Sequence, residues 1–141
     1  MFVAHQDIEQ ITQMIFQSMF ELDVVPSESS ALVTKGFLSE IPIHGNWNGS
    51  VRVYCNGELA RKVAERMFLI DEVELSPQDV TDAVGELTNM IGGNVKSLFG
   101  HECSLGFPSV QSEDLLNLGG EAVCVTSQHG TLRVVIEENQ L

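Results

Sequence analysis

The sequence predicts an α/β fold of the α+β-like kind, with two similar helix-strand-strand-strand halves that form one sheet covered by long helices. Three observations predict it: segments with helical periodicity, short runs rich in β-branched residues, and an internal repeat. The chain has 141 residues, of which 43% are hydrophobic. That size and composition suit a single domain over residues 1–141 with its own core.

Three segments have the apolar spacing of amphipathic helices. Residues 5–22 carry isoleucines and a methionine at intervals of three and four, and residues 57–69 form a shorter helix of the same kind. The third helix begins at Pro77, after a serine suited to the N-cap, and extends to about Phe99, because Gly100 ends it. Its predicted core stripe comprises Val80, Val84, Leu87, Ile91, Val95 and Leu98.

The remaining apolar runs are short and are predicted to be strands. Residues 31–43 alternate loosely and are predicted to be extended, and residues 44–49 are predicted to turn. Clearer strand signals cover residues 50–55, 103–108, 121–127 and 131–137. Residues 109–120, which follow a proline and end in two glycines, are predicted to be a loop.

An internal repeat relates the two halves of the chain. The segment Gln10-Ile11-Thr12-Gln13-Met14-Ile15 aligns with Glu86-Leu87-Thr88-Asn89-Met90-Ile91. Farther along, a His-Gly pair precedes Ser50-Val51-Arg52-Val53, and a second precedes Thr131-Leu132-Arg133-Val134. Because both matches occur in the same order, we interpret them as a duplication, which predicts an approximate two-fold axis through the sheet.

Charge and composition exclude several function classes. The formal charge of −13 disfavours binding to nucleic acid or to anionic lipid. We expect no membrane span, because no apolar stretch is long enough, and a cytoplasmic location, because the first residues lack the features of a signal peptide. The three cysteines are predicted to be buried, reduced thiols. The histidines lack metal-ligand spacing, so no metal site is predicted.

The third helix carries the residues best suited to chemistry. Its predicted polar face comprises Asp82, Glu86, Asn89, Gly93 and Lys96, at spacings of four and three. This is also what an ordinary solvated helix face looks like. The adjacent pair Gly92-Gly93 leaves three alternatives open: close approach of another protein, a break in the helix, or close packing against a neighbouring helix.

The motif on this helix resembles a known family. Asp82-x-x-x-Glu86-x-x-Asn89, followed by Met-Ile-Gly-Gly, is similar to the signature helix of the CheC/CheX/FliY chemotaxis phosphatases. The single copy of Glu-x-x-Asn, the chain length and the acidic balance are most similar to the CheX branch. The Phe107-Pro108-Ser109-Val110 segment and the closing strands extend the resemblance over most of the chain.

The resemblance implies a phosphatase that acts on the phosphoaspartate of a CheY-like response regulator. Asn89 would orient the attacking water and Glu86 would pair with a lysine of the regulator, while Asp82, Gly92, Gly93 and Lys96 would lie against the partner. The regulator would supply Mg²⁺, so the resemblance implies no cofactor in this chain. It also implies a homodimer paired through sheet edges.

The first half of the repeat predicts one site per chain rather than two. Gln10 and Gln13 stand where the second half has Glu86 and Asn89, so the acid is lost and the amide sits on a longer side chain. An alternative class of function also remains at this point. The domain would then be a non-catalytic adaptor or a flagellar switch-type module that binds a response regulator without dephosphorylating it.

Overall fold

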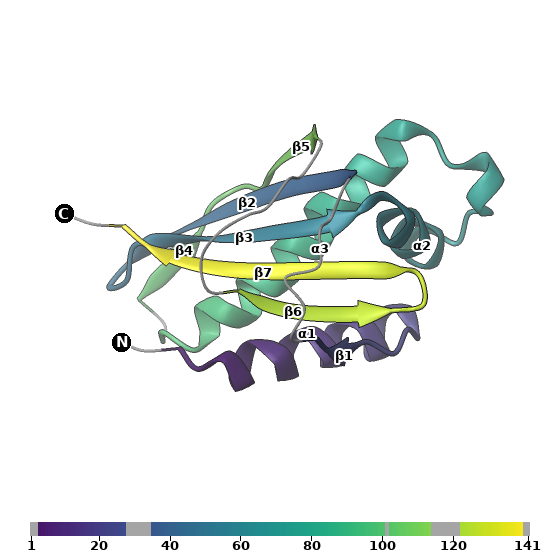
Figure 1. The fold of residues 1–141 in the computed structure, drawn as a ribbon. Coiled ribbons are helices and arrows are strands. Elements are labelled where there is room, and N and C mark those ends of the chain that lie inside the picture. Colours follow the sequence, from purple (N-terminus) through teal and green to yellow (C-terminus); the bar gives the residue numbers. More distant parts are fainter. Residues whose placement is uncertain (1–2, 28–34, 101, 114–121, 140–141) are drawn as a thin grey trace.

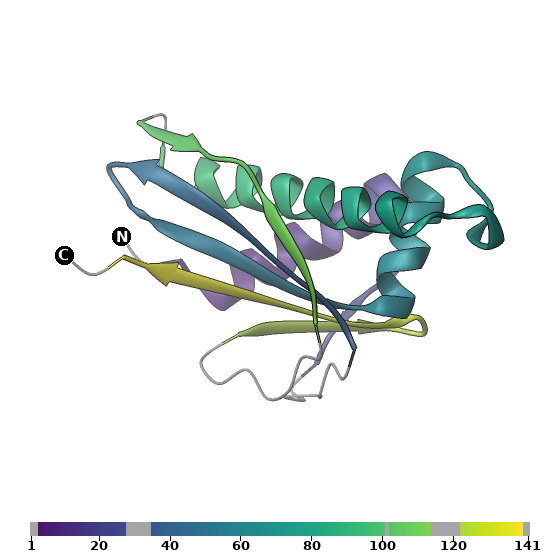
Figure 2. The ribbon, with the colours of Figure 1, turned by 90° about the horizontal axis from the view of Figure 1, so that it is seen from above.

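The computed structural model describes residues 3–27, 35–100, 102–113 and 122–139. Within them, one seven-stranded sheet carries the helices on one of its faces (Figures 1 and 2). The elements are α1 His5–Phe20, β1 Val25–Pro26, β2 Gly36–Gly45, β3 Gly49–Asn56, α2 Gly57–Phe68, the 3₁₀ helix η1 Glu72–Glu74, α3 Pro77–Ser97, β4 Cys103–Leu105, β5 Ser109–Glu113, β6 Val123–Ser127 and β7 Gly130–Glu138.

The sheet is antiparallel and has the predicted two-fold symmetry. Its strand order is β1-β6-β7-β3-β2-β4, and β5 also pairs with β2. In the central pair, Val53 of β3 lies opposite Val134 of β7, and these two residues occupy equivalent positions of the sequence repeat. Equivalent residues can pair directly only on the axis that relates the two halves. The pseudo-two-fold axis therefore passes through the middle of the sheet, between β3 and β7.

The repeat extends to individual contacts. Thr12 of α1 and Thr88 of α3 are both fully buried, and each hydroxyl donates to the backbone carbonyl four residues earlier, at 2.7 and 2.8 Å. The two His-Gly turns are also alike, since Gly45 and Gly130 both have a φ of 141°. Glycine tolerates that angle without strain. Duplication is thus visible in the helices, the turns and the strand pairing.

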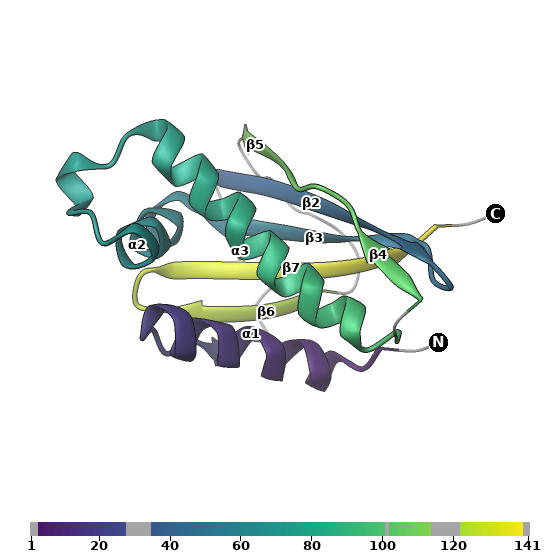
Figure 3. The same ribbon diagram turned by 180° about the vertical axis from the view of Figure 1, so that it is seen from behind.

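One hydrophobic core fills the space between the helices and the sheet. Figure 3 shows α3 crossing the sheet diagonally, with α1 beside it. Five of the six residues predicted for the core stripe of α3 are buried, and Val84, Leu87 and Ile91 are fully so. The prediction is wrong for Leu98, which is 39% exposed because α3 ends before it, at Ser97. Alternate residues of β2, β3 and β7 meet them, among them Ile41, Val53 and Leu132. Within the described ranges, no helix is long and apolar enough to cross a membrane.

The ends and continuity of α3 are set by local sequence. The Ser76 hydroxyl accepts from the Asp79 amide at 3.1 Å, and the Asp79 carboxylate accepts from the Ser76 amide at 2.9 Å. Such a capping box stabilises a helix start by about 1 kcal/mol. The helix then continues to Ser97 without interruption. The alternative of a break at Gly92-Gly93 is therefore wrong.

The prediction of a loop over residues 109–120 is wrong in its first part. Ser109–Glu113 forms β5, which pairs with residues 36–40 of β2; residues 114–120 lie outside the described part of the chain. The predicted strand 103–108 is correspondingly shorter, because β4 ends at Leu105. An edge strand with a single apolar residue, Val110, has no hydrophobic alternation to signal it. The short edge strand β1 was missed because it has only two residues and one of them is a proline.

Trp47 and the cysteines behave as core residues. The Trp47 ring is 7% exposed and stacks on Phe99 at 4.4 Å, and its indole N–H donates to Glu138 at 3.0 Å. Trp47 is therefore a buried anchor of the turn between β2 and β3. All three cysteines are free and buried, and burial raises the pKa of Cys55 to about 12. The Cys55 thiol is thus protonated at neutral pH and unreactive.

The glycine pair of α3 gives a stability prediction with an internal control. A Cβ atom on Gly92 would lie 2.7 Å from Cγ2 of the fully buried Ile41, whereas one on Gly93 would meet nothing within 4 Å. We expect Gly92→Ala to lower the free energy of unfolding by about 1–3 kcal/mol through overpacking. Gly93→Ala should raise it by up to about 1 kcal/mol through helix propensity. Urea unfolding of both variants checks this, and equal effects would contradict the assigned packing.

Candidate functional site

The polar face of α3 points away from the sheet. Asp82 and Glu86 are exposed and Asn89 is half-buried, while the residues between them anchor the helix in the core. Glu86 and Asn89 are three residues apart, so their side chains leave the helix about 4.5 Å apart along its axis and on one side. The predicted arrangement of acid and amide on one accessible face is therefore present.

Glu86 and Asn89 have no partners of their own. Across the residues that the structure describes, neither side chain forms a hydrogen bond or an ion pair. Neighbouring polar side chains of α3, in contrast, do form hydrogen bonds. Asp82 accepts from the Gln78 amide at 2.7 Å, and the Asn94 amide donates to the Met90 carbonyl at 2.8 Å. Glu86 and Asn89 thus keep their hydrogen-bonding capacity for a group outside the chain.

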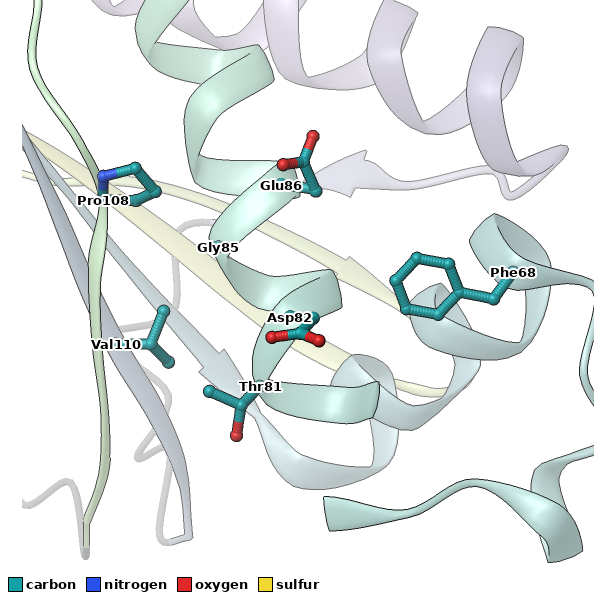
Figure 4. A pocket seen from close by; sticks show the side chains of 7 residues that line it. All are labelled: Phe68, Thr81, Asp82, Gly85, Glu86, Pro108 and Val110. Carbon is teal, nitrogen blue, oxygen red and sulfur yellow. The ribbon is translucent and has the colours of Figure 1, made fainter. Parts of the chain in front are cut away.

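A shallow, open pocket of about 530 Å³ lies beside Glu86 (Figure 4). Its floor belongs to α3, which contributes Asp82 and Glu86. Phe68 at the end of α2 forms one side, and Pro108 and Val110 form the other. The pocket combines two carboxylates with apolar walls. Such a site suits a positively charged side chain whose aliphatic stem contacts the walls.

Sequence reasoning missed the walls of this pocket. Phe68 and Val110 are 42 residues apart in the chain and meet only because α2 and β5 flank α3. No local pattern reports such a juxtaposition. Of the wall residues, Pro108 and Val110 carried a signal, because both belong to the Phe107-Pro108-Ser109-Val110 segment of the family resemblance.

The two glycines of α3 have different surroundings. Gly93 lies on the outward side with open space where a side chain would be, and Lys96 is half-buried one turn later. Gly92 is buried, and it faces Ile41 and Leu105 of the sheet. Its missing side chain thus permits close packing within the chain, against the sheet and not against a helix. We therefore do not assign Gly92 to the outward face.

The matching position on α1 is occupied differently. The Gln13 side-chain amide donates to the Val24 carbonyl at 3.2 Å, so the chain itself uses the group that corresponds to Asn89. Gln10 is exposed but carries no charge. No group of three or more His, Cys, Asp or Glu that could hold a metal ion exists among the described residues. His101 lies outside them.

Comparison with protein families places this duplicated domain among the chemotaxis phosphatase families. The family described as chemotaxis phosphatase CheX matches residues 37–128, which is more than half of the chain and includes α3. The chain therefore belongs to the CheX family. A comparison with curated proteins gave no match.

Solved structures share the fold over nearly the whole chain. The chemotaxis protein CheX of Desulfovibrio desulfuricans is 25% identical, with a TM-score of 0.74, over 95% of this chain and 97% of that one. CheX of Vibrio vulnificus is 22% identical, with a TM-score of 0.76, over 96% and 100%. A complex of CheX with CheY, BeF₃ and Mg²⁺ from Borrelia burgdorferi is 18% identical in its matching chain, with a TM-score of 0.68, over 96% and 97%.

Proposed function

We propose that this protein dephosphorylates the phosphoaspartate of a CheY-like response regulator. The observation that carries the proposal is the pair Glu86 and Asn89, which lie one turn apart on the outward face of α3 and have no side-chain partner among the described residues. Membership of a chemotaxis phosphatase family supports the reaction class. The Borrelia burgdorferi structure, a CheX in complex with CheY, supports the choice of partner.

Asn89 would act on the attacking water. Phosphoryl transfer is catalysed mainly by positioning and by charge stabilisation, and an acyl phosphate is already reactive. A carboxamide can both accept from and donate to one water, so it can hold that water in line with the phosphorus. No nucleophile of this chain is required. The regulator would supply the Mg²⁺ that neutralises the phosphoryl oxygens.

Glu86 would dock the helix. Its carboxylate is exposed and unpaired, so it can form a charge-assisted hydrogen bond with a lysine of the regulator. Because Glu86 and Asn89 are one helical turn apart, such a bond would fix the register of Asn89 over the phosphoryl group. Gly93 leaves room for close approach, and Lys96 lies farther along the same side.

The second candidate is a non-catalytic adaptor for a response regulator. The shared fold supports it equally, since α3 offers one docking face in either case. An adaptor needs Glu86 but has no use for an unpartnered amide one turn away, so Asn89 favours the phosphatase. Homodimerisation through a sheet edge and a cytoplasmic location stay predictions. The sheet order leaves β1 and the β4–β5 side as the candidate edges.

Asn89→Ala tests catalysis. We expect the regulator to bind as before, while the stimulated rate of dephosphorylation falls at least about 100-fold, the usual effect of removing one polar group that acts only in the transition state. Phosphate release from an acetyl-phosphate-charged CheY-like regulator measures the rate. Asn94→Ala is the control, because the Asn94 amide is already bonded to the Met90 carbonyl. Binding of the wild-type protein without acceleration would establish the adaptor instead.

Glu86→Gln tests docking. The substitution keeps the shape and removes the charge, so the KM should rise about tenfold with little change in kcat. The KM of the wild-type protein should rise with salt concentration, because salt screens an exposed ion pair. The KM of the variant should depend less on salt. Glu58→Gln, at an exposed glutamate in the first turn of α2, is the matched control. An unchanged KM and salt dependence would show that Glu86 does not pair with the regulator.

A further inference from the structure

We propose that Phe107 and Leu69 form an apolar clamp on the two sides of the α3 face, and that a response regulator buries both when it docks. This inference rests on the proposed function, which supplies the occupant. It adds two binding residues that lie outside α3 and outside the Glu-x-x-Asn motif.

The two residues are among the most exposed large apolar side chains described: Phe107 is 92% exposed and Leu69 is 89% exposed. Each is the chain neighbour of a residue that lines the pocket beside Glu86. Phe107 precedes Pro108, and Leu69 follows Phe68. Figure 4 shows Pro108 and Phe68 on opposite sides of α3, with Asp82 and Glu86 between them. Apolar groups thus flank the carboxylates from two separate elements.

A bulge in the edge strand presents Phe107. The register pairs Leu105 with Ile43 and Ser109 with Glu40, so residues 106–108 face only residues 41–42 of β2. The extra residue interrupts the edge and turns a side chain away from the ladder.

The backbone around the bulge is held firmly. The Gly106 amide donates to the Pro42 carbonyl at 2.9 Å, and a Cβ on Gly106 would lie only 2.5 Å from the Pro42 ring. The following residue, Pro108, has a fixed φ. Phe107 is therefore exposed on a preorganised backbone, which lowers the entropy that is lost when a partner buries it.

Leu69 combines a strained backbone with an exposed apolar side chain, and contacts within the fold offset neither. It caps α2 with a φ of 56°, in the left-handed region that favours glycine, and it has little contact with the rest of the chain. Glycine would relieve the strain and remove an exposed apolar group. A leucine here gives no visible benefit to the fold of the described residues, which is consistent with a role in contact with a partner.

The acidic charge of this face indicates what kind of partner binds it. The chain has a net charge of −13, and the carboxylates of Asp82 and Glu86 lie between the apolar flanks. The complementary surface is a basic side chain with apolar residues on both sides, on a protein. Apolar flanks would also exclude water around the pair formed by Glu86 and the regulator's lysine, which strengthens that pair. A second copy of this acidic chain on the α3 face, as distinct from a sheet edge, would instead bring like charges against Asp82 and Glu86.

The experiment measures the Kd of a CheY-like response regulator loaded with BeF₃ and Mg²⁺ for the wild-type protein, Phe107→Ala, Leu69→Gly and the double variant. Truncating an interface anchor typically weakens binding about fivefold or more, so each single variant should raise the Kd about fivefold and the double variant about 25-fold. Folding should be kept in both, since Phe107 is exposed and glycine fits the Leu69 backbone.

Glu21→Gly is the matched control, because Glu21 caps α1 at a φ of 54° and the backbone change is the same. A double variant that binds within fivefold of the wild type overturns the clamp. The clamp is also overturned if the variants bind the regulator normally and change only the sedimentation of the protein measured without the regulator. That result would assign these residues to contact between copies of the chain. In dephosphorylation assays the clamp variants should raise KM and spare kcat. Wild-type protein that neither binds nor stimulates the regulator would contradict the proposed function itself.

Discussion

The seating of α3 on the sheet is the constraint on which the rest of the structure depends. Val84, Leu87 and Ile91 enter the core, and Gly92 lets the helix lie directly on Ile41. A helix fixed along one buried stripe has no rotational freedom, so the residues on its other side are exposed by necessity. The direction in which Glu86 and Asn89 point is therefore decided by core packing, and it needs no support from other polar groups.

The two-fold repeat explains why only one half carries the motif. Duplication placed α1 and α3 in equivalent positions, with equivalent buried threonines at residues 12 and 88. The helices then differ in what their outward amide contacts. Gln13 donates to the Val24 carbonyl, beside β1, and stabilises its own half, whereas Asn89 forms no side-chain hydrogen bond within the part of the chain that the structure describes. The longer side chain of glutamine is thus suited to structure, and the shorter, unbonded asparagine is left available to a partner.

The sequence predicted the parts of the fold that depend on local spacing and missed those that depend on the sheet edge. The helices and the outward face of α3 follow from periodicities of three and four residues, the capping serine from its place before Pro77, and the duplication from the aligned segments. β5 was missed because four of its five residues are polar, and the two-residue β1 contains a proline. Gly92 and Gly93 look identical in the sequence, and only the position of Ile41 separates them. Phe107 is exposed at the point where the registers of β4 and β5 on β2 differ by one residue. No single segment of the sequence encodes that difference.

A site that works by positioning places particular demands on the protein that carries it. Asn89 must be held rigidly, yet it must stay free of bonds that would compete with the water it orients. A long helix closed by a capping box and buried along one side meets the first demand. Within the described residues the Asn89 side chain forms no hydrogen bond, which meets the second. Both properties come from placing the amide on a core helix rather than in a loop, where local backbone groups would satisfy it.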